Sequence, residues 1–199
     1  RPGPAVAVVA IGGPPTRHGD CYANKDPARC LRGNWLDVLR FLGEPELRAR
    51  PGERSYRLLA FPGFTSWTSF RLEIDRDGKG ALTTVVAPNL DMQPDVTASW
   101  RSERSLSKAQ VAEIERIVAL SKVEQILTDR RAWRTRLQCY DGDDVVFEAS
   151  AKGLYRYVNR NSCDPDFNKL GSLEDLFFTL SPEARRRLRI PRTPFSPEQ

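Results

Sequence analysis

The stretch CYDGDDVVFEASAKGLYRYVNRNSC, residues 139–163, shows strand periodicity more clearly than any other part of the chain. In residues 145–150 an apolar series, Val-Phe-Ala, alternates with a mixed series, Val-Glu-Ser, as in a strand with two different faces. Residues 154–160 alternate in a similar way after a short break. We therefore predict a β-hairpin here, stapled by the cysteines at its two ends.

The three aspartates near the start of this stretch raise an alternative, an acidic site that holds a metal ion or moves a proton. A calcium-binding EF-hand loop needs an oxygen ligand at its fifth position and glycine at its sixth. Counted from Asp141, the fifth residue is Val145, so the pattern fails. An ion pair across the hairpin with Arg156 or Arg160 explains Glu148 better. We therefore expect no metal site and no bound cofactor.

The rest of the chain predicts more strands and few helices. The expected strands are residues 55–62, 69–76, 80–87 and 97–106. The clearest helix is residues 107–120, which Ser107 and Gln110 begin with a capping box. Strands joined in hairpins, without β-α-β alternation, predict an α+β fold. We expect an antiparallel sheet with one main helix packed on a face, and short N- and C-terminal helices.

The short helices have recognisable ends. Asn34 can begin an N-terminal helix, and Gly43 can end it. Near the C-terminus, Ser172 is predicted to cap one helix, and Pro182 is predicted to open another at its first position. The expected organisation is an extended arm with a cystine loop at 1–33, a single α+β domain at 34–192, and a tail at 193–199.

The four cysteines, Cys21, Cys30, Cys139 and Cys163, form no CxxC pair, so zinc spacing is absent. Disulfides Cys21–Cys30 and Cys139–Cys163 are expected, because each would close a local loop. The alternative is four free, buried thiols in a cytosolic protein. Because the chain starts at Arg1 without methionine, we expect that a secretory signal or a lipoprotein leader has been removed. The alternative is an arbitrary chain boundary.

The sequence contains few of the residues that known enzymes use for catalysis. The only histidine, His18, lies among prolines and glycines, so serine–histidine or cysteine–histidine catalysis is not expected. We predict that the protein is not an enzyme. The alternative is an envelope hydrolase that uses a carboxylate pair, such as Glu148 with Asp143 or Asp144.

The net charge of +5 suggests a polyanion as partner, but the distribution of charge does not. Lysines and arginines are interspersed with acidic residues, and no nucleic-acid-binding motif accompanies them. The dense run at 184–192 is explained by the solvated face of a C-terminal helix. We therefore expect no nucleic acid as partner. The alternative is a binder of anionic envelope polymers through Arg185, Arg186, Arg187 and Arg189.

The stretch FPGFTSWTSF, residues 61–70, is the best candidate for a binding surface. Its aromatic residues fall at every third position around Pro-Gly, which does not suit one face of a strand. An exposed loop here would show an apolar patch of the kind that marks interfaces. The expected binding residues are Phe64, Trp67, Phe70 and Arg71. The alternative is that these rings cover the core.

The motifs YDGDDVVFEA and GLYRYVNRNSC, with a helix before and a helical pair after them, resemble uncharacterised bacterial envelope proteins, often lipoprotein-like. The resemblance covers about residues 55–180. It implies a periplasmic α+β domain and brings no catalytic residues. Some envelope proteins of this kind are immunity proteins against toxins. We therefore expect a periplasmic or secreted domain that binds another protein, as an inhibitor or immunity protein, with peripheral membrane association through a removed lipid anchor.

Overall fold

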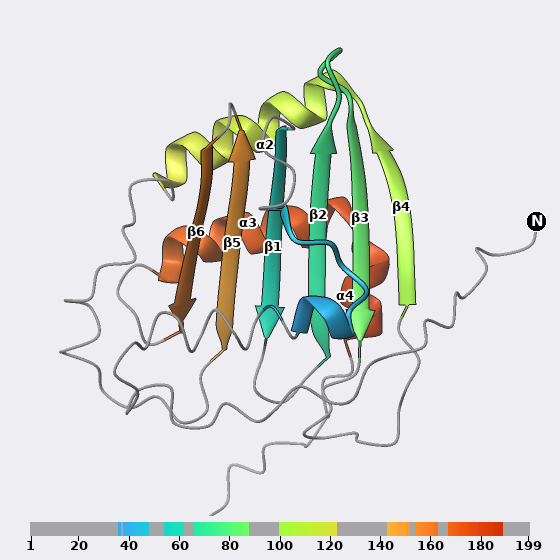
Figure 1. Ribbon diagram of the computed structural model, residues 1–199, viewed down its shortest axis with the longest axis vertical. Helices are drawn as coiled ribbons and strands as arrows, with labels where there is room; N and C mark the ends of the chain where they lie inside the picture. The colour runs from blue at the N-terminus through green and yellow to red at the C-terminus, as the bar shows by residue number, and fades with distance from the viewer. Residues whose placement is uncertain are drawn as a thin grey trace, which may run out of the picture.

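The computed structural model confirms the α+β fold, with a six-stranded antiparallel sheet and several helices (Figure 1). It describes residues 36, 38–47, 54–61, 66–87, 100–122, 143–151, 154–162 and 167–188. The strands are β1 (Arg54–Phe61), β2 (Trp67–Ile74), β3 (Gly80–Ala87), β4 (Trp100–Leu106), β5 (Asp144–Ala151) and β6 (Leu154–Asn161). The helices are α2 (Lys108–Ser121), α3 (Phe167–Leu180) and α4 (Pro182–Arg187). The predicted arm, the tail and all four cysteines lie outside the described residues.

The sheet has the strand order β4-β3-β2-β1-β5-β6, and every neighbouring pair is antiparallel. The predicted hairpin of β5 and β6 is confirmed, with Phe147 opposite Val158 and Glu148 opposite Tyr157. The hairpin of β2 and β3 is also confirmed. At its tip Gly78 has a φ of 80°, and the carboxylate of Asp75 accepts a hydrogen bond from the Lys79 backbone N–H at 2.9 Å.

Helices α2, α3 and α4 cover one face of the sheet, here called the first face; in Figure 1 they lie behind the strands. The capping box of α2 is confirmed, because Ser107 Oγ accepts from the Gln110 N–H at 3.3 Å and Gln110 Oε1 accepts from the Ser107 N–H at 3.0 Å. Val111, Ile114 and Val118 of α2 are buried against the sheet. The first face therefore carries the larger part of the hydrophobic core.

Helix α3 differs from the prediction in its start. It begins at Phe167 and is as long as α2, with 14 residues each, so Ser172 lies inside the helix and does not cap it. The prediction placed the start of the helix at Ser172, because serine is a favoured N-cap residue, but the helix continues N-terminally through Gly171. One glycine costs a helix only about 1 kcal/mol, which the packing of Leu173 and Phe177 in the core outweighs.

The second face of the sheet packs against a short helical segment at residues 38–41, which lies in front of the strands in Figure 1. As predicted, Gly43 ends the helix, with a φ of 64°. The Gly43 N–H donates to Arg40 O at 3.1 Å and the Glu44 N–H to Leu39 O at 2.8 Å, a Schellman motif. This turn directs the chain back over the sheet, so Glu44 is buried.

None of the helices among the described residues is long and apolar enough to span a lipid bilayer.

Candidate functional site

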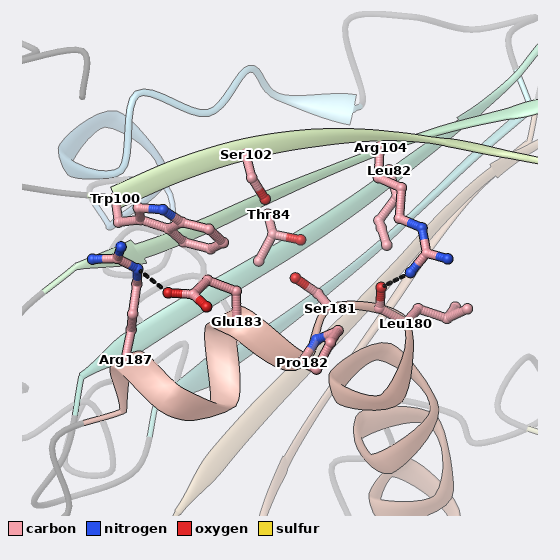
Figure 2. Close-up of a pocket in the computed structure, with 10 residues that line it drawn as sticks. All are labelled: Leu82, Thr84, Trp100, Ser102, Arg104, Leu180, Ser181, Pro182, Glu183 and Arg187. Atoms are coloured by element: carbon pink, nitrogen blue, oxygen red, sulfur yellow. Dashed lines mark hydrogen bonds and ion pairs between the residues drawn. The ribbon is translucent and has the colours of Figure 1, made fainter. Parts of the chain in front are cut away.

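A pocket of about 380 Å³ lies under strands β3 and β4, where the corner between α3 and α4 approaches the first face (Figure 2). Its lining residues are Leu82, Thr84, Trp100, Ser102, Arg104, Leu180, Ser181, Pro182, Glu183 and Arg187. The volume is within the range of about 300–1,000 Å³ that is typical of ligand pockets. The pocket is therefore large enough for a side chain of a partner or a small ligand.

The pocket exists because the helices cover β3 more completely than β4. Trp100, Ser102 and Arg104 share the first face, since the register places Trp100 opposite Val86 and Arg104 opposite Leu82. The side chains of Trp100 and Ser102 are half-buried and Arg104 is exposed, whereas the facing residues of β3 are buried. Strand β4 thus overhangs the helical layer and forms one wall of the pocket.

Two arginines stand at opposite ends of the pocket, as Figure 2 shows. Arg104 Nη1 donates to the carbonyl oxygen of Leu180 at 2.7 Å. Arg187 Nε lies 3.0 Å from Glu183 Oε1, and its guanidinium stacks over the Trp100 ring, 5.0 Å from the centroid. Arg187 therefore shares its charge with a carboxylate, whereas Arg104 forms no ion pair with another described residue.

The lining of the pocket combines apolar side chains with hydroxyl groups. Leu82 is buried beneath it and Leu180 lies at its edge, while Thr84, Ser102 and Ser181 contribute hydroxyl groups. An apolar group of a ligand can fill such a space, while polar groups next to it form hydrogen bonds with these hydroxyl groups. Because Arg104 has no carboxylate partner among the described residues, an anionic group next to that apolar group would be favoured.

A second charged cluster lies on the second face, and it is buried. Arg57 Nη1 is 2.9 Å from Glu148 Oε2, and both side chains are 0% exposed. Tyr155 Oη donates to Glu148 Oε1 at 2.7 Å. Burial raises the pKa of Glu148, and the attraction of Arg57 and the hydrogen bond from Tyr155 offset only part of this effect. Glu148 therefore has the environment of a structural ion pair between β1 and β5.

This pairing corrects the prediction that Glu148 pairs with Arg156 or Arg160. The register places Tyr157 opposite Glu148, and successive side chains of β6 alternate between faces. Arg156 and Arg160 consequently belong to the first face, whereas Glu148 belongs to the second. Its partner comes from β1, the neighbouring strand on its other side, with Arg57 directly opposite.

Glu44 completes the buried cluster from the segment that follows the helical turn. Its Oε2 accepts a hydrogen bond from Arg71 Nε at 2.8 Å, and its Oε1 lies 3.1 Å from Arg101 Nη2. Arg57 Nε is 3.8 Å from Glu44 Oε2, and Arg57 also donates to the carbonyl oxygen of Pro45. The cluster therefore attaches this segment to three strands, β1, β2 and β4.

Trp67 and Phe70 of the expected aromatic binding stretch lie in the core. Trp67 is buried between Phe41 and Phe61, with ring centroids 5.9 and 6.0 Å away. Phe70 is completely buried and packs against Phe177 at 5.5 Å. Arg71 is held by Glu44, as described above. The rings of Trp67 and Phe70 therefore pack in the core, the alternative that the sequence left open, and all three side chains belong to strand β2. Phe64 lies outside the described residues.

The predicted basic surface is exposed but paired. Arg185 Nη2 lies 3.3 Å from Asp175 Oδ1, and Arg186 Nη2 lies 2.7 Å from Glu183 Oε2. Arg189 lies outside the described residues. The acidic partners lower the net positive charge that this helix would present to a polymer.

The carboxylate pair of the hydrolase alternative is not assembled around Glu148. Asp144 shares its face but is four residues away along the strand, which corresponds to about 13 Å. Asp143 is exposed at the start of the strand, whereas Glu148 is buried with both oxygens engaged. In the described part of the chain, no group of three histidine, cysteine or acidic residues could hold a metal ion.

One titratable group stands out on α3. Burial raises the pKa of Glu174 to about 7, and the nearby charges of Asp143 and Asp175 act in the same direction, opposed by Arg185. The sequence did not single out this residue, because its burial results from packing between elements that are distant in the sequence. Glu174 lies outside the pocket, so we treat it as a determinant of stability.

Sequence reasoning also missed the site itself. Trp100 was expected only as a residue of the strand at 97–106, and Arg187 only as part of a basic run. Their contact joins residues 87 positions apart, as the numbering shows. A scan against models of known protein families found no match to this chain, and a search of the curated proteins found no significant match. The resemblance to envelope proteins therefore stays a prediction.

Proposed function

We propose that this chain is a non-catalytic, exported domain that binds another protein, as an inhibitor or immunity protein for an envelope-acting toxin or hydrolase. The observation that carries the proposal is the stacked pair of Trp100 and Arg187 at the pocket under β4. Binding through this site replaces the aromatic stretch at 61–70, whose Trp67 and Phe70 are buried.

The composition of the site supports a protein partner. Tryptophan and arginine are the residues most often found at the energetic centre of protein interfaces, in well-packed pockets surrounded by a polar rim. Here the rigid indole of Trp100 is held by the guanidinium of Arg187, which is fixed in turn by Glu183. A pre-ordered pair of this kind loses little conformational entropy when a partner binds.

The other two functions have weaker support. A binder of anionic polymers needs free cationic charge, but Arg185 and Arg186 each pair with a carboxylate. A hydrolase needs two carboxylates around one cleft, but Glu148 lies in a buried ion pair. Export is supported by the cysteine pattern, which lacks zinc spacing. The periplasmic or secreted location thus belongs to the proposal together with the binding role.

The proposal is tested by affinity capture from an envelope extract of the native organism. The bait is the full chain, compared with Trp100→Ala and with Leu120→Ala. Leu120 is 66% exposed on α2, outside the residues that line the pocket, so it is a matched control for loss of an exposed apolar side chain. We expect a protein that wild type and Leu120→Ala retain equally and that Trp100→Ala retains at least tenfold less. Capture of no protein by wild type, or equal capture by Trp100→Ala, would contradict the proposal.

A further inference from the structure

Resting on the proposed function, we infer that the partner binds as an extended segment that adds to the outer edge of β4. In this arrangement an apolar side chain of the segment enters the pocket, and an acidic residue two positions away pairs with Arg104. The inference thus names both the mode of recognition and the sequence pattern of the partner.

The described strands leave the outer edge of β4 unpaired. Trp100–Leu106 pairs with β3 from Val86↔Trp100 to Gly80↔Leu106, and β4 is the terminal strand in the sheet order. Among the described residues no strand pairs with its other edge. An edge strand presents unpaired backbone N–H and C=O groups that can bind another strand. The seven residues of β4 are long enough for several such hydrogen bonds.

The side chains of β4 connect this edge to the pocket. In an antiparallel pair, directly opposed residues have Cβ atoms about 4.5–5.5 Å apart on the same face. A residue of the added segment opposite Ser102 would therefore project toward the pocket that Ser102 lines, between the positions opposite Trp100 and Arg104. In Figure 2 these three side chains of β4 extend toward the α3–α4 corner, which forms the opposite wall of the pocket.

Charge determines what the flanking residue should be. Arg104 is exposed, donates to the carbonyl oxygen of Leu180, and has no carboxylate partner among the described residues. The segment residue opposite Arg104 lies two positions from the residue opposite Ser102, on the same face. Aspartate or glutamate there would gain a charge-assisted hydrogen bond. A second copy of this chain would instead bring another net charge of +5 to the same edge.

The test uses a phage-displayed library of linear 12-residue peptides, selected on the wild-type full chain, followed by a synthetic peptide of the consensus sequence. We expect the consensus to contain a large apolar residue with Asp or Glu two positions away. Its affinity, measured by fluorescence anisotropy, should fall at least tenfold for Ser102→Trp, which fills the pocket. It should change less than twofold for Ser105→Trp, which adds the same ring on the opposite face of β4.

One further variant and a set of modified peptides separate strand addition from simple occupation of the pocket. Arg104→Glu should lower the affinity for the acidic peptide at least tenfold. The same variant should bind more tightly a peptide in which lysine replaces the acidic residue. Peptides methylated on alternate backbone nitrogens should differ, because in a strand only every second N–H points to its neighbour. Thermal unfolding of each variant shows whether it has folded, and the Arg104→Glu charge swap keeps the test valid if Ser102→Trp does not fold.

Several results would overturn the inference. The first is the absence of any enriched peptide. The second is equal affinity of Ser102→Trp and wild type for the consensus peptide. The third is an equal loss of affinity for peptides with either methylation pattern. Dimerisation in sedimentation experiments that Ser102→Trp abolishes would assign the edge to a second copy. If peptides fail but capture of a folded protein still depends on Trp100, strand addition is wrong and the proposed protein binding stands. If both fail, the proposed function is wrong as well.

Discussion

Arg57 and Glu148 face each other across strands β1 and β5 and form an ion pair of 2.9 Å from which solvent is completely excluded. The pair lies on the face of the sheet opposite to the pocket. A buried ion pair is weak evidence for net stabilisation, but removal of one partner is costly because the other charge stays buried and unpaired. This relationship explains why a strand of the C-terminal half is fixed next to β1.

We predict that Arg57→Met destabilises the protein by about 3–5 kcal/mol at neutral pH, the usual cost of an unpaired buried charge. The free energy of unfolding from urea denaturation measures the effect. The double variant Arg57→Met with Glu148→Met removes both charges and should recover most of the loss. A single variant within about 1 kcal/mol of wild type, the range of an exposed pair, would contradict the assignment of this pair as a buried one.

Glu174 should make stability depend on pH. Its folded-state pKa of about 7 is above the ordinary value of 4.5, so the folded protein holds this proton more tightly. The contribution is therefore favourable at low pH and is lost as the pH rises from about 4.5 to about 7. Since the side chain is half-buried and partly screened, we expect about 1–2 kcal/mol.

Glu174→Gln should remove this pH dependence and stabilise the protein by about the same 1–2 kcal/mol above pH 7. Urea denaturation at a series of pH values measures the difference between the variant and wild type. Because Glu148 also has a raised pKa, only this difference isolates Glu174. Parallel pH profiles for the two proteins would show that Glu174 titrates normally.

Glu44 should hold the helical segment at 38–41 on the second face. Glu44→Gln keeps the shape of the side chain but weakens its contacts with Arg71 and Arg101. We expect the backbone amides of 38–44 to exchange at least tenfold faster in hydrogen-exchange mass spectrometry, with little change in α2. The control is Glu46→Gln, because Glu46 is exposed on the same segment. Equal exchange in both variants would mean that apolar packing alone holds the segment.

Substitution by alanine should have opposite effects on stability at two glycines. A Cβ at Gly80 would lie 2.7 Å from Leu72 Cδ1 and 2.8 Å from Val111 Cγ2, so Gly80→Ala should cost about 1–3 kcal/mol. At Gly171, inside α3, a Cβ would meet nothing within 4 Å, and alanine should stabilise by about 0.5–1 kcal/mol. Thermal and urea unfolding measure both variants. Stabilisation by Gly80→Ala would show that α2 does not pack closely on β3.

Local sequence patterns predicted the local parts of the fold. The alternation in residues 145–150 assigned the two faces of β5 correctly, and the capping box placed the start of α2. The order of the strands depends on pairings such as that of Arg57 with Glu148, which are 91 residues apart. No local pattern contains this information. The partner of Glu148 was therefore sought inside the hairpin, and the prediction was wrong.

The candidate site was hidden for a similar reason. The number of aromatic residues in 61–70 led to the prediction of a binding surface there. Trp67 and Phe70 are instead core residues on opposite faces of β2. Trp100 stands alone in its segment, and its importance follows only from the position of α4 beneath β3. A pocket that β3, β4 and the α3–α4 corner form together has no signature in any one of these elements.

Photo-cross-linking from Pro182 is the sharpest test of whether the pocket beside β4 is a protein-binding surface, because Pro182 lines the pocket and is exposed at its edge. Benzoylphenylalanine is introduced at Pro182 or, as control, at the exposed Leu120 of α2, and intact cells of the native organism are irradiated. We expect one dominant protein adduct from position 182, absent from position 120 and lost when Trp100→Ala is added. No adduct from position 182, or the same adducts from both positions, would show that the pocket does not bind a protein.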